Sequence, residues 1–223
     1  MATNDWTRAV YFTSLSDIKN ILGIDKYLHQ EGLAHRFMPV EAVGYYKDAG
    51  GVFVDGSYEL LMADDIRWGN LNDPDVAIDP ESRRSVLFVK QAYTRLARTL
   101  LNSKKKAQAV EVLDKCIEFF PNDKIPYDVM MLSCPEMYYI AGATEKGDKF
   151  VSDMLDNCLD NLRYYYELEP KFMLYYSDDI YENLAIMEKL STITNKYKRN
   201  ELKAQVSAAF NEQNRKFYPY LNK

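Results

Sequence analysis

After about residue 82, apolar residues recur at intervals of three and four positions through most of the chain. This spacing places them on one face of an α-helix. The clearest stretch covers residues 145–169, and others cover 84–101, 105–120, 178–197 and 200–217. The C-terminal part of the chain is therefore predicted to be a set of amphipathic helices.

The first part of the chain follows another pattern. Short β-prone runs occupy residues 9–13 and 33–43, and Pro39 inside the second run predicts an edge or irregular strand. We therefore expect a small mixed α/β part over residues 1–82 and a helical part over residues 83–223.

Short helices are also expected before the boundary, over residues 17–22 and 55–68. Gly50 and Gly51 predict a turn between them, and the proline-containing, acidic stretch 70–81 predicts a loop.

Residues 90–123 match the tetratricopeptide pattern of two helices with fixed bulky and small positions. Small residues let the paired helices approach closely, and a proline ends the second helix. The positions that match are Tyr93, Leu96, Ala97, Leu100, Ala109, Leu113, Cys116 and Pro121. The predicted fold is therefore mainly α, a tetratricopeptide-like α-hairpin array (an α-α superhelix) that follows the α/β part.

A second repeat is recognisable only in distorted form. Tyr138 and Gly147 fit a bulky and a small position, but Pro135 and Met154 stand where smaller residues are usual. Pro135 predicts a kink or break near residues 131–133. A last helix pair forms a generic hairpin, so three stacked units would bury a continuous core.

Charge and composition exclude some classes of function. The net charge of −5 and the pI near 5.2 argue against nucleic acid as a partner. The basic run 104–106 falls in a predicted turn, where solvated lysines are more usual than an anion site. The N-terminus lacks a signal-peptide pattern, and no apolar window is long enough for a transmembrane segment.

Candidate catalytic and metal-binding residues are few. Cys116, Cys134 and Cys158 lack the spacing of a disulfide framework or zinc site, which predicts buried free thiols. His29 and His35 lie six positions apart, a poor spacing for a metal pair. No cofactor is expected.

The chain contains two kinds of carboxylate pair, adjacent aspartates and an Asp-x-Asp run. Neighbouring residues on a helix point about 100° apart, so neither Asp64 with Asp65 nor Asp178 with Asp179 converges on one ion. The run 73–75 matches the Asp-x-Asp motif of metal-dependent sugar-nucleotide transferases, but no strand leads into it.

Tyrosine is abundant, with 18 residues, and several occur in pairs or triplets. Consecutive residues of a helix cannot all face the core, so some of these rings should be exposed. Packing between helices is the main alternative, and stacking on sugar rings is another. As a candidate binding surface we select Tyr138, Tyr139, Tyr165 and Tyr175.

Three runs, residues 2–12, 27–36 and 67–72, resemble in order three motifs of a family of large bacterial polytopic membrane proteins. The chain departs from that family at Ala9, where the family has Pro, and at His35, where it has Tyr. The family has no assigned function and is similar to the protein O-mannosyltransferase branch of lipid-linked-sugar glycosyltransferases. The resemblance covers essentially the whole chain, within the family's soluble C-terminal half.

The resemblance implies a location on the periplasmic side of the inner membrane and no catalytic residue in this chain, since that family's catalytic acids lie in its membrane half. We expect a non-catalytic accessory domain that binds or scaffolds a polypeptide, a glycan or its own membrane half. The alternatives are a stand-alone metal-dependent transferase using Asp73 and Asp75 or the two histidines, and a purely structural cap.

Overall fold

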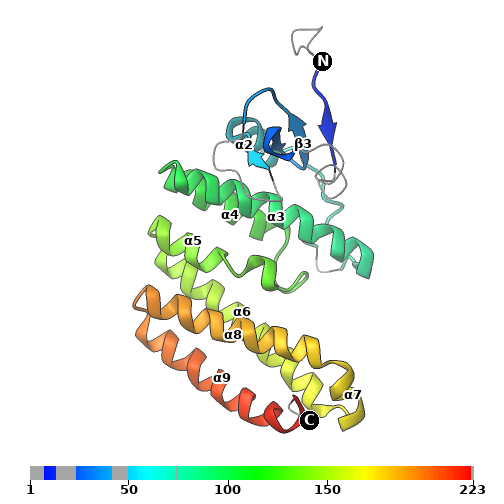
Figure 1. Ribbon diagram of the computed structural model, residues 1–223, viewed down its shortest axis with the longest axis vertical. Helices are drawn as coiled ribbons and strands as arrows, with labels where there is room; N and C mark the ends of the chain where they lie inside the picture. Colours follow the sequence, from blue (N-terminus) through cyan, green and yellow to red (C-terminus); the bar gives the residue numbers. More distant parts are fainter. Residues whose placement is uncertain (1–7, 14–23, 42–49, 74, 222–223) are drawn as a thin grey trace. The chain divides into compact units, whose positions relative to one another are not determined.

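The computed structural model describes residues 8–13, 24–41, 50–73 and 75–221. It is mainly helical, with a small mixed sheet near the N-terminus (Figure 1). The predicted fold class, mainly α with a small N-terminal α/β part, is confirmed. The chain forms two compact units: unit 1 ends at Phe120 and unit 2 begins at Pro121.

The sheet of unit 1 has the strand order β1-β3-β2-β4. β2 and β3 are antiparallel and meet at a tight turn in which Gly32 has a φ of 63°. β1 is antiparallel to β3, and β4 is parallel to β2. The strands are β1 (Tyr11–Phe12), β2 (Leu28–Glu31), β3 (Ala34–Phe37) and β4 (Gly51–Val52), and a 3-10 turn, η2 (Asp25–Tyr27), precedes β2.

The strand predictions need correction at two places. β3 lies between β1 and β2, so it is not an edge strand. It ends at Phe37, before Pro39, and therefore keeps every backbone donor that its two neighbours use. Gly50 has a φ of 64°, as a turn requires, but Gly51 already belongs to β4. The predicted helix 17–22 lies outside the described residues.

The helices of unit 1 are α2 (Val54–Leu61), α3 (Pro80–Asn102) and α4 (Lys106–Phe119). The Asp79 carboxylate caps α3 by accepting from two backbone N–H groups, at 2.9 and 3.0 Å. α2 is shorter than the predicted helix 55–68. The chain beyond Leu61 is irregular because the Trp68 ring packs instead on Phe120, with centroids 5.3 Å apart.

Side-chain hydrogen bonds fasten α3 to the rest of unit 1. Gln30 Nε2 on β2 donates to the Ala92 carbonyl at 2.9 Å, and the Tyr93 hydroxyl donates to the Leu61 carbonyl at 2.8 Å. The hairpin of α3 and α4 therefore belongs to the same compact unit as the sheet. This division of the chain differs from the boundary at residue 82 that composition suggested.

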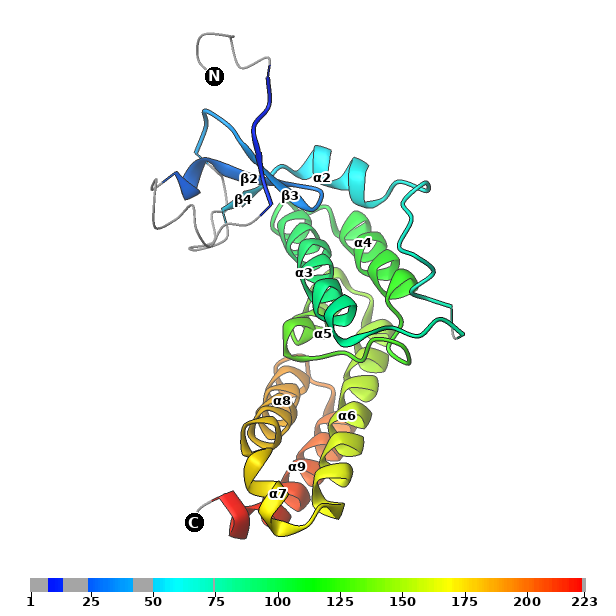
Figure 2. The same ribbon diagram turned by 90° about the vertical axis from the view of Figure 1, so that its right-hand side faces the viewer.

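All the regular elements among the described residues of unit 2 are helices (Figure 2). Pro135 lies in the first turn of α5, where it displaces no helical hydrogen bond, and Gly142 ends α5 with a φ of 92°. The elements are η3 (Val129–Met131), α5 (Cys134–Ala141), α6 (Thr144–Glu167), α7 (Pro170–Tyr175), α8 (Ser177–Lys196) and α9 (Asn200–Leu221).

Consecutive helices of unit 2 pack in pairs, α5 against α6 and α8 against α9, while α6 also packs against α8. The shared core uses the apolar stripe of each helix. Among its most buried side chains are Met137, Tyr138, Phe150, Val151, Leu162, Ile180, Met187, Leu190, Val206 and Phe217. η3 ends at Met131 and α5 begins at Cys134, so the chain is interrupted where Pro135 predicted a kink or break, but no α-helix precedes the interruption.

Candidate functional site

Exposed aromatic and aliphatic side chains gather at the end of unit 2 where α6 is followed by α7 and α8. Tyr175 is 80% exposed and Tyr164 56% exposed, which is unusual for large rings that lie near one another. We call this group, together with the half-buried Tyr165 and Tyr176, the aromatic surface; its exposed members are Tyr164, Phe172, Leu174 and Tyr175.

Four tyrosine rings of this surface form a continuous row. The Tyr164 and Tyr165 rings meet edge to face, with centroids 5.5 Å apart. Tyr165 stacks on Tyr176 at 5.2 Å, and Tyr176 meets Tyr175 edge to face at 5.1 Å. Because each ring restrains the next, the exposed hydroxyls and ring faces are held in defined positions.

The local sequence explains this arrangement. Successive residues of α6 point about 100° apart, so the triplet 164–166 sends its rings in three directions. Pro170 begins α7 shortly after α6 ends, and Met173 is buried while its neighbours Phe172 and Leu174 stay exposed. On this six-residue helix the buried Met173 side chain packs into the core, so the apolar side chains on either side of it in the sequence are exposed to solvent.

The border of the aromatic surface is acidic on the α8 side, whereas on α7 Lys171 Nζ lies over the Phe172 ring at 4.8 Å from its centroid. Burial raises the pKa of Tyr165, and the nearby carboxylates of Asp179 and Glu182 raise that pKa further. The Tyr165 phenol therefore remains a protonated donor beside negative charge. Asp178 and Asp179 occupy the first turn of α8, where the helix dipole favours negative charge.

A second polar cluster joins α5, α6 and the turn between α8 and α9. The Asp148 carboxylate accepts from the Tyr139 hydroxyl at 2.9 Å and from Arg199 Nε at 2.9 Å, and Arg199 Nη2 donates to its other oxygen. The Tyr139 ring stacks on Tyr197 with centroids 4.9 Å apart. Burial, followed by the Asp148 contact, raises the pKa of Tyr139.

A polar cavity of about 560 Å³ adjoins this cluster. Its walls include Asp148, Ser152, Arg199 and Gln205. In this cavity the negative charge of Asp148 and the positive charge of Arg199 neutralise each other. We assign this cluster a structural role, because its ion pair and ring stack tie the α8–α9 turn to α6.

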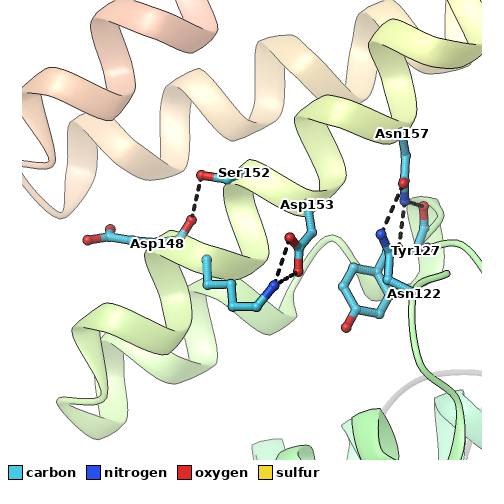
Figure 3. A network of polar contacts seen from close by, with 7 residues as sticks. Asn122, Tyr127, Asp148, Ser152, Asp153 and Asn157 are labelled. Atoms are coloured by element: carbon cyan, nitrogen blue, oxygen red, sulfur yellow. Dashed lines mark hydrogen bonds and ion pairs between the residues drawn. The ribbon is translucent and has the colours of Figure 1, made fainter.

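Further along α6, a network of amides holds the segment before η3 (Figure 3). Asn157 and Asn122 exchange hydrogen bonds at 2.8 and 3.1 Å. Asn157 also donates to the Tyr127 carbonyl at 3.3 Å, and the Tyr127 N–H donates to Asn122 at 2.8 Å. The network contains no ionisable side chain, so it positions the backbone and does no proton chemistry.

The structure places the predicted repeat residues in the core. Each of those on α3 and α4 is at most 1% exposed, while Pro121 is half-buried at the start of unit 2. These residues are Tyr93, Leu96, Ala97, Leu100, Ala109, Leu113, Cys116 and Pro121.

The predicted tyrosine surface needs correction. Tyr138 and Tyr139 are 1% and 8% exposed, because α5 packs this side against α6. They offer no ring face to a partner. Tyr165 and Tyr175 do belong to one surface, and the structure adds Tyr164, whose 56% exposure cannot be assigned from the run of three tyrosines alone. Phe172 and Leu174 were missed because the run 170–176 was not recognised as a helix.

Each of the two histidine rings lies within hydrogen-bonding distance of a polar group of the protein. His29 Nε2 lies 2.9 Å from the Val40 carbonyl oxygen, and His35 Nε2 lies 3.3 Å from Arg95 Nη1. Burial and the Arg95 charge lower the pKa of His35 to about 4. A guanidinium beside the ring repels a metal cation, so His35 is a poor ligand here.

The remaining polar candidates lie in turns or at the surface. Asp73 Oδ1 accepts from the Asp75 backbone N–H at 3.0 Å, which explains this exposed turn without a metal. No three His, Cys, Asp or Glu residues gather around one point in the described part of the chain. Lys104, with a φ of 62°, lies in the α3–α4 turn as predicted.

The three cysteines are free and buried, as predicted. Burial raises the pKa of Cys116 and of Cys158 to about 12. Both thiols are therefore protonated at neutral pH and unreactive.

Comparison with known proteins relates the N-terminal part of the chain to a protein family. Residues 1–55 match the family model named TMEM260-associated domain 2. The match covers 55 of 223 residues and links the N-terminal part of the chain to a membrane protein family. No curated protein and no solved structure matches the chain significantly. Among the described helices, none combines the length and apolar character needed to cross a membrane.

Proposed function

We propose that this chain is a non-catalytic accessory region of a glycosyltransferase-like membrane protein and that unit 2 binds a polypeptide on its aromatic surface. The match of residues 1–55 supports the link to a membrane protein, and the three sequence runs support the glycosyltransferase-like parent. The paired helices, read as tetratricopeptide-like hairpins, supply a rigid support.

The observation that carries this proposal is the row of tyrosine rings from Tyr164 to Tyr175. A tyrosine offers an apolar ring and a polar hydroxyl, and it loses little conformational freedom when it binds. Rings held by their neighbours lose still less. Such fixed aromatic side chains are the ones that dominate binding energy at protein interfaces.

The charge around the surface selects the kind of polypeptide. Asp178, Asp179 and Glu182 are exposed beside the rings. A basic, extended polypeptide would meet apolar rings in the centre and carboxylates at the border. It could be an acceptor chain or a segment of the parent's membrane half. Electrostatic attraction of this kind mainly accelerates association and weakens as salt is added.

The experiment is a titration of the 223-residue chain with fluorescent, unstructured peptides of equal length. One peptide is rich in Lys, one is rich in Glu, and a neutral oligosaccharide replaces them in a third series. We expect saturable binding of the Lys-rich peptide, weakened by salt. The double variant Phe172→Ser/Tyr175→Ser should bind at least about tenfold more weakly, equivalent to about 1.4 kcal/mol.

The matched control is Phe88→Ser, because Phe88 is 71% exposed on unit 1. It should leave the affinity unchanged. Binding of the Lys-rich peptide that ignores the double variant, or a preference for the Glu-rich peptide, contradicts the proposal. Oligosaccharide binding that the double variant abolishes contradicts it as well.

The proposed location is the periplasmic side of the inner membrane, as part of the parent protein. A reporter enzyme that is active only in the periplasm, fused to the end of the full-length parent, tests this. Activity is expected, and an inactive but stable fusion argues against the location.

A further inference from the structure

A groove lies between α6 and α9, and Tyr166, the member of the tyrosine triplet outside the aromatic surface, forms part of its wall. Its volume is about 270 Å³. It is lined by Leu159, Arg163, Tyr166, Glu212, Gln213 and Lys216. The groove thus combines one aromatic wall with an amide, a carboxylate and two cationic side chains.

Tyr166 is fixed in this wall. Its ring meets the buried Phe217 ring edge to face, with centroids 5.8 Å apart and planes inclined by 83°. Phe217 is 0% exposed, whereas Tyr166 is 47% exposed. Contact with the core therefore holds one part of the Tyr166 ring, and the remainder is open to a ligand. Lys216 Nζ stands over the ring at 5.9 Å from its centroid, the outer limit of a cation–π contact.

The charges around the groove compensate one another. Lys216 Nζ lies 2.8 Å from a Glu212 carboxylate oxygen, and this contact lowers the pKa of Glu212. Arg163 is paired in turn with Asp160 at 3.1 Å. The two cationic side chains that line the groove, Arg163 and Lys216, are each paired with a carboxylate, so neither is an open site for an anion. What remains is a set of hydrogen-bond donors and acceptors around an apolar ring.

We propose that this groove binds a single hexose unit of a neutral glycan. The apolar face of a sugar ring would lie on Tyr166, and its hydroxyls would bond with Arg163, Gln213 and the Glu212–Lys216 pair. A space of about 270 Å³ is slightly smaller than the sites of drug-sized ligands, which begin at about 300 Å³, and so fits one sugar ring. This site uses other residues than the aromatic surface and does not depend on polypeptide binding there.

The test is saturation-transfer NMR on the 223-residue chain with methyl glycosides of mannose, glucose and galactose. We expect saturable binding of at least one glycoside. Tyr166→Ala should weaken it at least tenfold, and Gln213→Ala should weaken it severalfold. Tyr166→Phe should bind within about threefold of the unchanged chain, because it keeps the ring face.

Tyr166→Leu separates binding from folding, because leucine preserves apolar contact with Phe217 but lacks the aromatic face. It should remain folded by circular dichroism and lose the glycoside. Tyr218→Ala on α9 is the control, because Tyr218 is 62% exposed and does not line the groove.

Three results overturn the inference: no glycoside binds, binding survives in both Tyr166→Ala and Tyr166→Leu, or inorganic phosphate competes for the groove. The Phe172→Ser/Tyr175→Ser variant should still bind the glycoside. Its behaviour separates a failure of this site from a failure of the aromatic surface.

Discussion

The ring of Tyr127 lies flat against the ring of Phe150, with centroids 4.1 Å apart and planes inclined by 5°. The two side chains are 6% and 2% exposed, so the stack is part of the core of unit 2. Because this stack joins the segment before η3 to α6, removing one of its rings should lower the free energy of unfolding.

Phe150→Ala should lower the free energy of unfolding by about 3–5 kcal/mol, the usual cost of emptying a buried aromatic position. Urea denaturation followed by circular dichroism measures this. The control Tyr175→Ala removes a ring that is 80% exposed and should change stability by no more than about 0.5 kcal/mol. A similar loss in both variants would show that Phe150 is not a core residue.

Asn157→Asp should destabilise unit 2 by about 1–3 kcal/mol. The carboxylate cannot donate to Asn122 Oδ1 or to the Tyr127 carbonyl, the two acceptors that Asn157 serves at 2.8 and 3.3 Å. The same urea titration measures the change.

Asp153→Asn is the matched control for that substitution. Asp153 pairs with the exposed Lys149 at 2.7 Å, and surface ion pairs contribute about 0–1 kcal/mol. Equal stability of Asn157→Asp and the unchanged chain would argue against the amide network.

Gly147→Ala should destabilise the chain by about 1–3 kcal/mol, although alanine favours a helix over glycine by about 1 kcal/mol. The added Cβ would stand 2.6 Å from Cε1 of Tyr139, whose buried ring is held by Tyr197 and Asp148. A lower midpoint temperature of thermal unfolding would measure this loss.

The Tyr139→Ala background provides the control, because it removes the atoms that the new methyl group meets. There, Gly147→Ala should be neutral or stabilising. A Gly147→Ala change that stabilises the chain with Tyr139 intact would refute the close contact.

Stability should rise with pH between about 4 and 6.5 through His35. Burial and Arg95 lower the pKa of folded His35 to about 4, so the unfolded chain binds this proton more readily across that interval. The contribution is fully present above pH 6.5, falls as the solution is acidified, and is gone below about pH 4. Since the ring is partly exposed, we expect on the order of 1–2 kcal/mol.

His35→Gln isolates this effect, because the amide oxygen can still accept from Arg95 but does not titrate. Urea titrations at several pH values should give a smaller slope for the variant between pH 4 and 6.5. Identical slopes would mean that His35 keeps its ordinary pKa in the folded chain.

The sequence predicted those features that depend on local periodicity. The stripe of residues 145–169 gave α6, and the repeat pattern placed Leu96, Ala97 and Leu113 in a helical hairpin whose core they do form. The break before Pro135 followed from the missing N–H of proline alone.

Features that depend on distant contacts were not predictable in this way. The bond between Gln30 and the Ala92 carbonyl spans 62 positions, and it joins the sheet to α3 in one unit. The burial of Tyr139 depends on Gly147 and Tyr197, neither of which is visible from the tyrosine pair itself. The exposure of Phe172 depends on which side of a six-residue helix Met173 anchors.

The buried cysteine thiols can report separately on the opening of each unit. Cys116 belongs to unit 1, while Cys134 and Cys158 belong to unit 2. An enclosed thiol reacts with an alkylating reagent only when its surroundings open, so the labelling of each cysteine reports the opening of its own unit. Mass spectrometry of the alkylated peptides would therefore follow both units separately in a single sample, without any engineered probe.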